Sequence, residues 1–253
     1  MLLDVLLLDI ETAPGLAYFW RPTDQYIPMD MVVRPGFLLG FGAKWRGQRG
    51  FTSHFVSEHE APEGDDYQIV EHVASMIRTA DVVVGHNIDR FDLPQINNRV
   101  LYYELEPLGP VRTIDTLKLA KANLDLPWNK LDFLGEYLGV GRKLKTDMDL
   151  WKSCLDGRGD ALKRMARYNK QDVILLEKVL DRMMPYVRNL RRLVDGDGDG
   201  VPTCPTCGSH NLMRRGFDRT QVSTWVKLQC QDCQRYTREP AALKSKKLGV
   251  TPL

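Results

Sequence analysis

Two acidic residues near the start of the chain stand at a spacing that suits a divalent cation. Asp9 and Glu11 end an apolar run and are two residues apart, so both side chains lie on the same face of a strand. Two like charges at a buried strand end repel each other unless a cation lies between them. The pair therefore predicts a metal site, although a solvated acidic turn after a strand is the simpler alternative.

Asp92 is a third acidic residue at a place where chemistry is expected. It ends the segment Gly85-His-Asn-Ile-Asp-Arg-Phe-Asp92, which follows the apolar run Val82–Val84. Open α/β sheets bind ligands beyond the carboxyl ends of their strands, so this segment is placed to offer a metal ligand. Aspartate is also a preferred helix N-cap, and taken alone the residue is better explained as the cap of the helix expected after Pro94.

Tyr168 and Asp172 lie four residues apart in a long helical stretch. This spacing places the phenol and the carboxylate on one face of the helix, one turn apart. A core tyrosine beside an exposed acid is the alternative explanation of the pair.

Together, these three motifs resemble those of the DEDDy exonucleases in type, order and expected element. That group includes the DnaQ-like proofreading exonucleases and the editing domains of family B polymerases. The resemblance to small phage-encoded, YprB-like exonucleases covers nearly the whole chain. It rests on Asp9-Ile-Glu-Thr-Ala-Pro14, Ala43-Lys-Trp45, Ile114-Asp-Thr-Leu117, Lys130-Leu-Asp-Phe-Leu-Gly-Glu-Tyr-Leu-Gly139 and Tyr168-Asn-Lys-Gln-Asp-Val173.

The resemblance implies an RNase H-like fold and a 3′→5′ exonuclease acting on single-stranded DNA with two Mg²⁺ or Mn²⁺ ions. It assigns Asp9, Glu11 and Asp172 to the metal that activates water, with Asp9 also reaching the second ion. It assigns Asp92 to a contact through water and Tyr168 to orienting the attacking water. RNA remains an alternative substrate, because such a site contacts phosphates, and an inactive nucleic-acid adaptor is a further alternative. We find no polymerase domain, so we expect no proofreading within this chain.

Four of the five cysteines form two pairs near the end of the sequence. Cys204 and Cys207 are followed, after 22 residues, by Cys230 and Cys233, a spacing typical of a structural Zn²⁺ site. Four thiolates fill a tetrahedral zinc, so we expect one structural ion and no catalysis there. Cys154 stands alone and is expected to be a small core residue.

The sequence around these cysteines resembles the zinc ribbons of transposase-associated and other DNA-binding proteins. Basic residues alternate there with Phe217, Trp225 and Tyr236, so we expect phosphate contacts and base stacking. The alternative is that the aromatic residues form the small core of the ribbon. The expected nucleic-acid-binding residues are Arg214, Arg215, Arg219, Lys227 and Arg235.

Periodicity predicts an α/β domain with a mixed sheet flanked by helices. Continuous or alternating apolar runs predict strands, and apolar residues at helical spacing predict helices. The expected strands are Val5–Ile10, Phe37–Lys44, Phe51–Val56, Val82–Val84 and Val111–Ile114, and the second and third pair antiparallel across the turn Trp45–Gly50. The expected helices are Asp66–Thr79, one after Pro94, a helical pattern from Asn129 and a long helix from Asp160 to Met184.

We expect four parts: residues 1–194 as the RNase H-like domain, 195–200 as a flexible linker, 201–240 as the zinc ribbon and 241–253 as a basic tail. The linker Asp195-Gly-Asp-Gly-Asp-Gly200 starts like a calcium loop, but Thr206 stands where such a loop needs glutamate. Residues 201–253 hold nine basic and three acidic residues, a net charge of +6, which leaves −4 for residues 1–200. A basic end on an acidic body favours contact with a polyanion.

The start of the chain carries no recognisable export signal. The apolar stretch Leu2–Leu8 is short and is interrupted by Asp4, and no run approaches the roughly 20 residues of a membrane span. We therefore expect a cytoplasmic protein (in the host cytoplasm if a phage encodes it) without membrane contact. A replication or repair protein is an expected partner.

Overall fold

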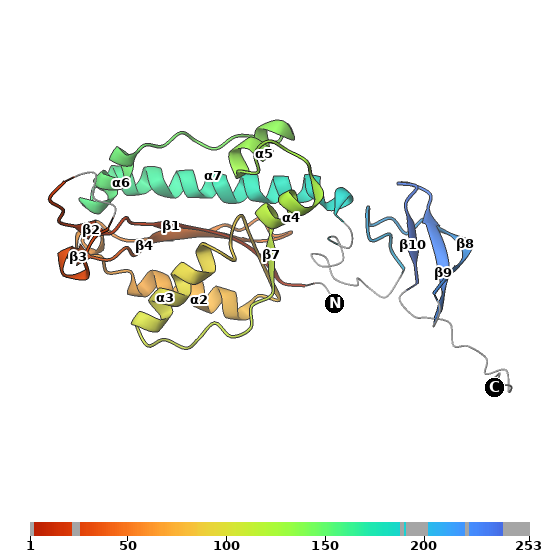
Figure 1. The fold of residues 1–253 in the computed structure, drawn as a ribbon, viewed down its shortest axis with the longest axis horizontal. Coiled ribbons are helices and arrows are strands. Elements are labelled where there is room, and N and C mark those ends of the chain that lie inside the picture. Colours follow the sequence, from red (N-terminus) through yellow and green to blue (C-terminus); the bar gives the residue numbers. More distant parts are fainter. Residues whose placement is uncertain (1–2, 22–25, 188–189, 191–201, 221–222, 240–253) are drawn as a thin grey trace. The chain divides into compact units, whose positions relative to one another are not determined.

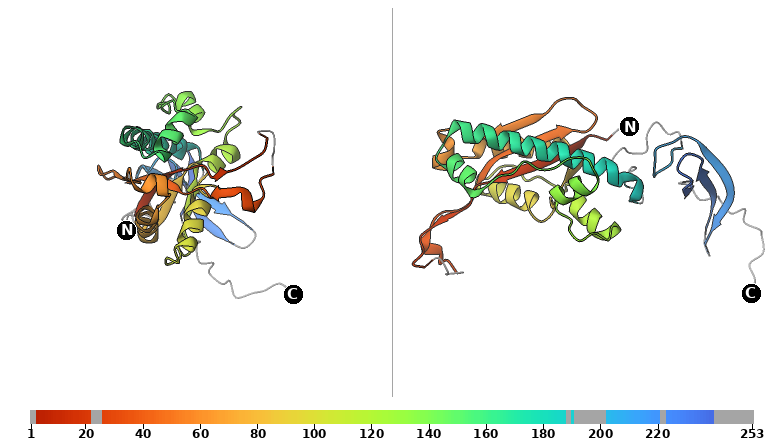
Figure 2. Two further views of the ribbon diagram at one scale, coloured as in Figure 1. Left: turned by 90° about the vertical axis from the view of Figure 1, so that its left-hand side faces the viewer. Right: turned by 90° about the horizontal axis from the view of Figure 1, so that it is seen from above.

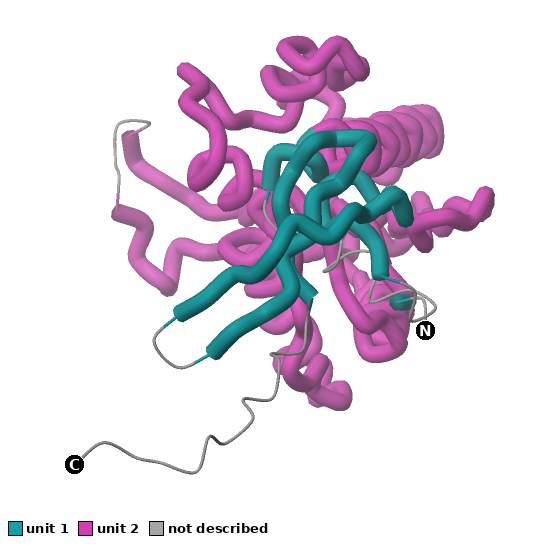
Figure 3. The backbone as a smooth tube through the Cα atoms, turned by 90° about the vertical axis from the view of Figure 1, so that its right-hand side faces the viewer, with its two compact units in different colours: residues 1–3, 183–253 teal, residues 4–182 magenta. Residues whose placement is uncertain are grey.

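The computed structural model describes residues 3–21, 26–187, 190, 202–220 and 223–239 (Figure 1). The chain divides into two compact units, one of residues 4–182 and one of residues 1–3 with 183–253 (Figure 3). The expected linker at 195–200 and basic tail at 241–253 lie outside the described residues, so the boundaries of the four expected parts stay predictions. No helix in the described ranges is long and apolar enough to cross a membrane.

The larger unit is built on a mixed five-stranded sheet with the order β5-β4-β1-β6-β7. β4 pairs antiparallel with β1 and with β5, whereas β6 pairs parallel with β1 and with β7. The strands of this sheet are β1 Val5–Thr12, β4 Leu38–Trp45, β5 Thr52–Phe55, β6 Val82–Gly85 and β7 Thr113–Asp115. The expected mixed sheet and the antiparallel pairing across residues 45–50 are confirmed.

Helices cover both faces of this sheet. The 25-residue helix α7 lies along one face, and α2 and α3 lie along the other (Figures 1 and 2). The helices are α1 Glu60–Glu63, α2 Tyr67–Thr79, α3 Asp92–Tyr102, α4 Thr116–Asn123, α5 Leu131–Tyr137, α6 Met148–Leu155 and α7 Gly159–Met183. Two 3-10 turns, Met29–Met31 and Met184–Tyr186, and a separate pair of short strands, β2 Leu16–Ala17 and β3 Val32–Arg34, complete the description up to residue 187.

β1 lies at the centre of the sheet, which explains its continuous apolar sequence. Its even-numbered residues Leu6, Leu8 and Ile10 pack with Phe41 and the apolar side of α2. Its odd-numbered residues face α7, because Asn169 of that helix contacts both Asp9 and Glu11. The alternation of a strand therefore sends the two acids into the space between the sheet and α7.

A buried ion pair fixes α3 against the sheet. The carboxylate of Asp66 accepts hydrogen bonds from Leu38 N of β4, at 2.7 Å, and from the guanidinium of Arg99 in α3. The Tyr103 hydroxyl donates to the same carboxylate, at 2.7 Å. Asp66 is only 1% exposed, and these donors supply the charge and hydrogen bonds that its burial requires. The contacts hold the helix that starts at Asp92.

β7 and α3 begin at other residues than the sequence predicts. β7 begins at Thr113 rather than Val111, because its partner β6 starts only at Val82 and Thr113 already pairs with Val83. α3 begins at Asp92 rather than after Pro94. Proline is tolerated there because the N–H groups of the first helical turn have no partner inside the helix.

The cysteine-rich part of the second unit contains a three-stranded antiparallel sheet of order β10-β9-β8. Its strands are β8 Leu212–Arg219, β9 Thr224–Cys230 and β10 Tyr236–Arg238. The buried side chains of this sheet are Val226, Leu228 and Cys230. Such a small core cannot stabilise a fold without a further crosslink, such as a metal ion.

Candidate active site

Three of the expected acidic residues come together on the α7 side of β1. Ligand oxygens of Asp9, Glu11 and Asp172 all lie within 4.8 Å of one another. Glu11 and Asp172 are buried, at 7% and 1% exposure, and Asp9 is half-buried. The solvated turn that was the alternative for Asp9 and Glu11 is therefore wrong.

Asp92 contacts the backbone of the same strand, β1. Its Oδ1 accepts a hydrogen bond from Ile10 N, at 3.2 Å, so it is tied to the backbone between Asp9 and Glu11. It is 3% exposed and is the first residue of α3, whereas Phe91 occupies the N-cap position. The capping explanation for Asp92 is wrong, since its side chain accepts a hydrogen bond from β1 and does not cap its own helix. Asp92 does not belong to the group of three acids whose oxygens lie within 4.8 Å.

Tyr168 and Asp172 lie on the same side of α7, as their spacing predicts. Lys143, in the segment that follows α5, lies between them: its Nζ is 2.6 Å from Asp172 Oδ2 and 3.4 Å from the Tyr168 hydroxyl. Trp151 of α6 touches the Tyr168 ring edge-on, with 6.4 Å between the ring centroids. The Trp151 indole N–H donates to Thr12 O at the end of β1, so the ring that supports Tyr168 is itself fixed.

The acids repel one another strongly. Burial raises the pKa of Glu11 to about 7, and repulsion from Asp172 adds to the rise. Burial also raises the pKa of Asp92 to about 7, against the opposing effect of the Ile10 N–H. Loss of solvent, together with repulsion from the other carboxylates, raises the pKa of Asp9 well above its ordinary value. A cation bound among these carboxylates would relieve the repulsion, which makes the cluster a candidate metal site.

A second layer of contacts holds the loop that carries Asp92. The Asp115 side chain accepts hydrogen bonds from Leu117 N and Lys118 N, which caps α4, and also from Asn87 N, at 3.0 Å. Asn87 has a positive φ of 71°, a conformation that asparagine tolerates better than most residues. The capped helix end and the loop after β6 are thereby tied together.

Sequence patterns did not reveal Asn169, Lys143 or Asp115. Asn169 lies inside the Tyr168–Asp172 motif, so inspecting each position of that motif would have raised it as a candidate. Asp115 directly precedes a helix, and a capping signal could have found it. Lys143 lies in an irregular segment 29 residues from Asp172, and no local pattern marks it.

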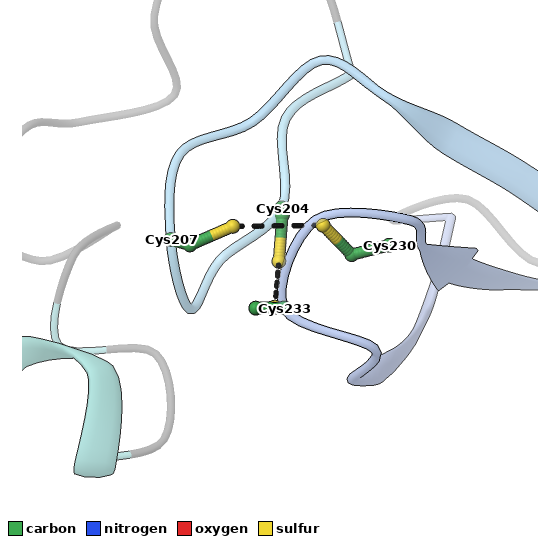
Figure 4. Close-up of side chains that lie close together, drawn as sticks. All are labelled: Cys204, Cys207, Cys230 and Cys233. Atoms are coloured by element: carbon green, nitrogen blue, oxygen red, sulfur yellow. Dashed lines mark hydrogen bonds between the residues drawn. The ribbon is translucent and has the colours of Figure 1, made fainter.

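The four paired cysteines converge in the second unit (Figure 4). Their Sγ atoms all lie within 4.8 Å of one another, with 3.6 Å between Cys204 and Cys233 and 3.5 Å between Cys207 and Cys230. A disulfide would need about 2.05 Å. Four thiolates around a tetrahedral zinc with Zn–S bonds of about 2.3 Å would lie about 3.8 Å apart. The cluster therefore has the dimensions of a zinc site.

Two tight turns shape this cluster. Gly208 N donates to Cys204 O, at 2.8 Å, and Cys230 N donates to Arg235 O, at 2.9 Å. Gly208 and Gln234, each the residue after the second cysteine of its pair, have positive φ angles of 75° and 62°. Both cysteine pairs are therefore followed by a residue in the left-handed region, and only the first pair has glycine there.

The expected basic residues lie on the ribbon's surface, and aromatic side chains lie among them. Arg214, Arg215, Arg219 and Arg235 are exposed, and Lys227 is half-buried. Phe217 and Tyr236 are 45% and 58% exposed, so they do not form the core, and that alternative is wrong for both. Cations stack on these rings: Arg214 lies 5.0 Å from the Phe217 centroid, and Lys227 lies 4.6 Å from the Tyr236 centroid.

The fold and the site define an α/β protein with a carboxylate centre on its middle strand, joined to a cysteine-rich β-module. A family model of the RNase_H superfamily matches residues 35–184, more than half of the chain, so the chain belongs to the RNase_H superfamily. The match starts after β1 and does not include Asp9 or Glu11. Superfamily membership and the acidic centre support nuclease activity.

Among solved structures, the chain is similar to the family B DNA polymerase from the hyperthermophilic archaeon Pyrobaculum calidifontis. The TM-score is 0.54 at 18% sequence identity, over 72% of this chain and 25% of the polymerase chain. At this identity the likeness shows a shared fold only, and this chain spans a quarter of the polymerase's length. A search of curated proteins finds no match.

Proposed function

We propose that the protein is a divalent-metal-dependent 3′→5′ exonuclease that hydrolyses single-stranded DNA. The observation that carries the proposal is the meeting of Asp9, Glu11 and Asp172 within 4.8 Å, one helical turn from the Tyr168 phenol. The four acids and the tyrosine of the DEDDy motifs are thus all present, on the element types that the resemblance requires. DNA is favoured because the similar fold of known structure belongs to a DNA polymerase.

The acidic centre fits Mg²⁺ or Mn²⁺. Its ligand atoms are carboxylate oxygens, which these hard cations prefer. Oδ1 of Asp172 is buried and has no hydrogen-bond partner among the described residues, so it is available as a ligand. Asp9, Glu11 and Asp172 would hold the first ion, Asp9 would also reach the second, and Asp92 would act through water. Bound cations would supply Lewis-acid activation of water and neutralise charge on the phosphodiester.

The remaining side chains position the reactants. Burial raises the pKa of Tyr168 to about 12, although Lys143 opposes the rise, so the phenol stays protonated and can orient the attacking water by a hydrogen bond. A hollow of about 360 Å³, lined in part by the Trp151 ring that contacts Tyr168, opens between the end of β1 and the start of α6. We assign the terminal nucleotide to this hollow, which is lined by Thr12, Pro14, Thr146, Asp147, Met148 and Trp151.

We further propose that the cysteine cluster binds one structural Zn²⁺ and that the ribbon binds nucleic acid. Support comes from the tetrahedral dimensions of the cluster and from the charge of the described ribbon. Residues 202–239 contain six basic and three acidic side chains. Arginine and lysine can neutralise phosphates, and the exposed Phe217 and Tyr236 rings can stack on bases. We also propose a replication or repair protein as partner and the cytoplasm as location.

Labelled oligonucleotides test the proposal. Pure protein is incubated with single-stranded DNA and RNA carrying a label at the 3′ or the 5′ end, with Mg²⁺, with Mn²⁺ or with EDTA. We expect mononucleotides from the 3′ end of DNA, none with EDTA and none from Asp9→Ala. Since Asp9→Ala relieves repulsion, the metal-free variant should melt at the wild-type temperature or above it.

Three results would contradict the proposal. Release of the 5′ label first would reverse the direction, and cleavage of a 3′-blocked strand would point to an endonuclease. Near-wild-type turnover by Asp9→Ala with Mg²⁺ would remove the acidic centre from the mechanism altogether. Faster digestion of RNA than DNA would change the substrate and leave the site assignment standing.

A further inference from the structure

A fully buried amide lies against the two carboxylates of β1. Nδ2 of Asn169 donates to Asp9 Oδ2 at 2.9 Å and to the Asp9 backbone oxygen at 3.1 Å, and it lies 3.5 Å from Glu11 Oε1. The Asn169 side chain is 0% exposed. Ionised carboxylates only accept hydrogen bonds, so the NH₂ end is the end that suits this position. The Asn169 amide therefore contacts both Asp9 and Glu11.

The opposite end of the amide has room only because residue 42 is glycine. Gly42 of β4 is the register partner of Asp9 in β1. A Cβ atom added there would lie 2.1 Å from Asn169 Oδ1, well inside van der Waals contact, and also 2.9 Å from Phe51 Cζ. Oδ1 itself is buried and has no hydrogen-bond partner among the described residues. The glycine thus fixes how closely α7 brings Asn169 to β1.

The Asn169 oxygen points towards Gly42 rather than towards the acids, so it is not placed as a metal ligand. Its role must then be exerted through Asp9 and Glu11. Without the amide, these two side chains would lose the donor that they share in the metal-free protein, and cation binding would have to orient them. Hydrogen-bond partners of metal ligands typically change metal affinity by roughly 10–100-fold.

We infer that Asn169 is a positioning residue that holds Asp9 and Glu11 ready for a divalent cation, and that Gly42 provides the space this requires. The inference rests on the proposed metal-dependent function of the same site. It goes beyond the acids and the tyrosine by adding one residue inside the Tyr168–Asp172 motif and one on a neighbouring strand.

The test measures Mn²⁺ binding directly. Isothermal titration of the zinc-loaded, full-length protein compares wild type with Asn169→Ala, and Asp9→Ala reports any binding outside the acidic centre. We expect Asn169→Ala to bind Mn²⁺ roughly 10–100-fold more weakly. At saturating Mn²⁺ the KM for an oligonucleotide should stay unchanged, because Asn169 does not touch the substrate. Asn97→Ala, an exposed asparagine on α3, is the matched control and should bind as wild type.

A double-mutant cycle tests the link to Gly42. Gly42→Ala should push the amide away and weaken Mn²⁺ binding as Asn169→Ala does. In an Asn169→Ala background the clash with Oδ1 is gone, so adding Gly42→Ala should weaken Mn²⁺ binding much less, whereas the clash with Phe51 Cζ is present in both backgrounds and cancels in the cycle. Such non-additivity is expected for residues in contact. Gly50→Ala is the control, since a Cβ there meets nothing within 4 Å.

Two outcomes would overturn the inference. One is Mn²⁺ affinity of wild-type strength in Asn169→Ala, and the other is an equal loss from Gly42→Ala with and without Asn169. If Asn169→Ala does not fold, by thermal unfolding, Asn169→Ser replaces it, because serine is too short to span both acids yet fills more space. Failure of the proposed function would look different: wild type itself would then bind no Mn²⁺ that depends on Asp9.

Discussion

Nζ of Lys143 lies 2.6 Å from Oδ2 of Asp172, so the acidic centre of the metal-free protein contains a cation of its own. Burial lowers the pKa of Lys143, but attraction to Asp172 and Asp9 raises it above its ordinary value, and the ammonium stays charged. Asp172 is 1% exposed, whereas the lysine side chain is 29% exposed and reaches towards solvent. Lys143 therefore neutralises the Asp172 carboxylate in the metal-free protein. A divalent cation would have to compete with this ammonium for Asp172.

Replacing this lysine should have opposite effects on stability and on metal binding. Lys143→Met leaves Asp172 buried without a countercharge, so the metal-free protein should unfold more easily at pH 8 than wild type. The loss should be smaller than the roughly 3–5 kcal/mol seen when one partner of a fully buried pair is removed, since the lysine is partly solvated. Mn²⁺ should bind several-fold more tightly, because its competitor is gone. Calorimetric unfolding and isothermal titration measure the two effects.

The exposed Lys145→Met is the control for Lys143→Met and should change neither quantity. Weaker Mn²⁺ binding in Lys143→Met would mean that the lysine organises Asp172 for the metal rather than competing with it. Lys143→Arg should keep the stability of the metal-free protein, since the charge is retained.

The phenol of Tyr168 is expected to act by hydrogen bonding. Tyr168→Phe should lower kcat by roughly 10²–10⁴-fold, the range of a positioned proton-transfer group. Its KM and Mn²⁺ affinity should stay at wild-type values, because the ring still packs against Trp151. Single-turnover kinetics at saturating Mg²⁺ measure the change. Tyr137→Phe, an exposed tyrosine on α5, is the control, and full activity of Tyr168→Phe would show that another group orients the water.

The stability of the metal-free protein should depend on Glu11 between pH 4.5 and 7. Burial raises the pKa of Glu11 from its ordinary 4.5 to about 7 in the folded protein, so the folded state binds a proton that the unfolded state has lost. The unfolding free energy therefore falls as the pH rises through this window. Compared with Glu11→Gln, metal-free wild type should lose thermal stability from pH 5 to pH 7.5.

Scanning calorimetry of both proteins in EDTA-free, metal-depleted buffers checks the difference, so that zinc stays bound. The comparison with Glu11→Gln removes contributions from groups that do not interact with Glu11, such as His86, whose pKa is lowered to about 4 mainly by burial. A constant difference between the two proteins across the pH range would show that Glu11 is already ionised in the folded, metal-free state. Adding Mg²⁺ at pH 7.5 should reverse the loss in wild type only.

Local sequence patterns predicted the five strands of the larger sheet and the helices α2, α3, α5 and α7, because features such as the β1 apolar run and the α2 helical spacing are set by burial itself. They placed Asp9 and Glu11 on one face correctly, since alternation along a strand is a local property. The capping explanation for Asp92 followed an equally sound local rule, yet the tertiary contact with Ile10 N overrode it. Patterns of single segments cannot show what another segment brings to the same place.

The contacts around Asn169 and Lys143 show this limit most clearly. The position of the Asn169 amide depends on the space left by Gly42. This glycine is 127 positions earlier in the sequence and lies next to the amide only because β4 pairs with β1. Lys143 belongs to no helical or strand periodicity in the sequence. Its backbone N–H donates to Asp132 Oδ1, at 2.7 Å, and this contact helps to hold it in place. Both residues reach the acids only through the fold, so a motif search finds the proposed ligands and misses the side chains that contact them.

The ribbon is expected to act as a tether that holds substrate near the acidic centre. The residues proposed for the site all come from the larger unit, and tethering raises the effective concentration of substrate without changing the chemistry. Cutting the chain after Val194 should raise KM strongly on long strands and change kcat little on short oligonucleotides. The affinity should also lose part of its salt dependence, since fewer counterions are released.

Steady-state kinetics and the slope of log affinity against log salt, for full-length and truncated protein, measure these effects. Cys207→Ser should imitate the truncation, because it removes one of the four thiolates that converge in the cluster. Arg214→Ser, on the exposed strand β8, should lower the salt slope by about one phosphate contact while leaving the zinc content unchanged. Unchanged KM and salt slope in all three variants would show that the ribbon binds a protein instead, and a replication protein would then be the first partner to test.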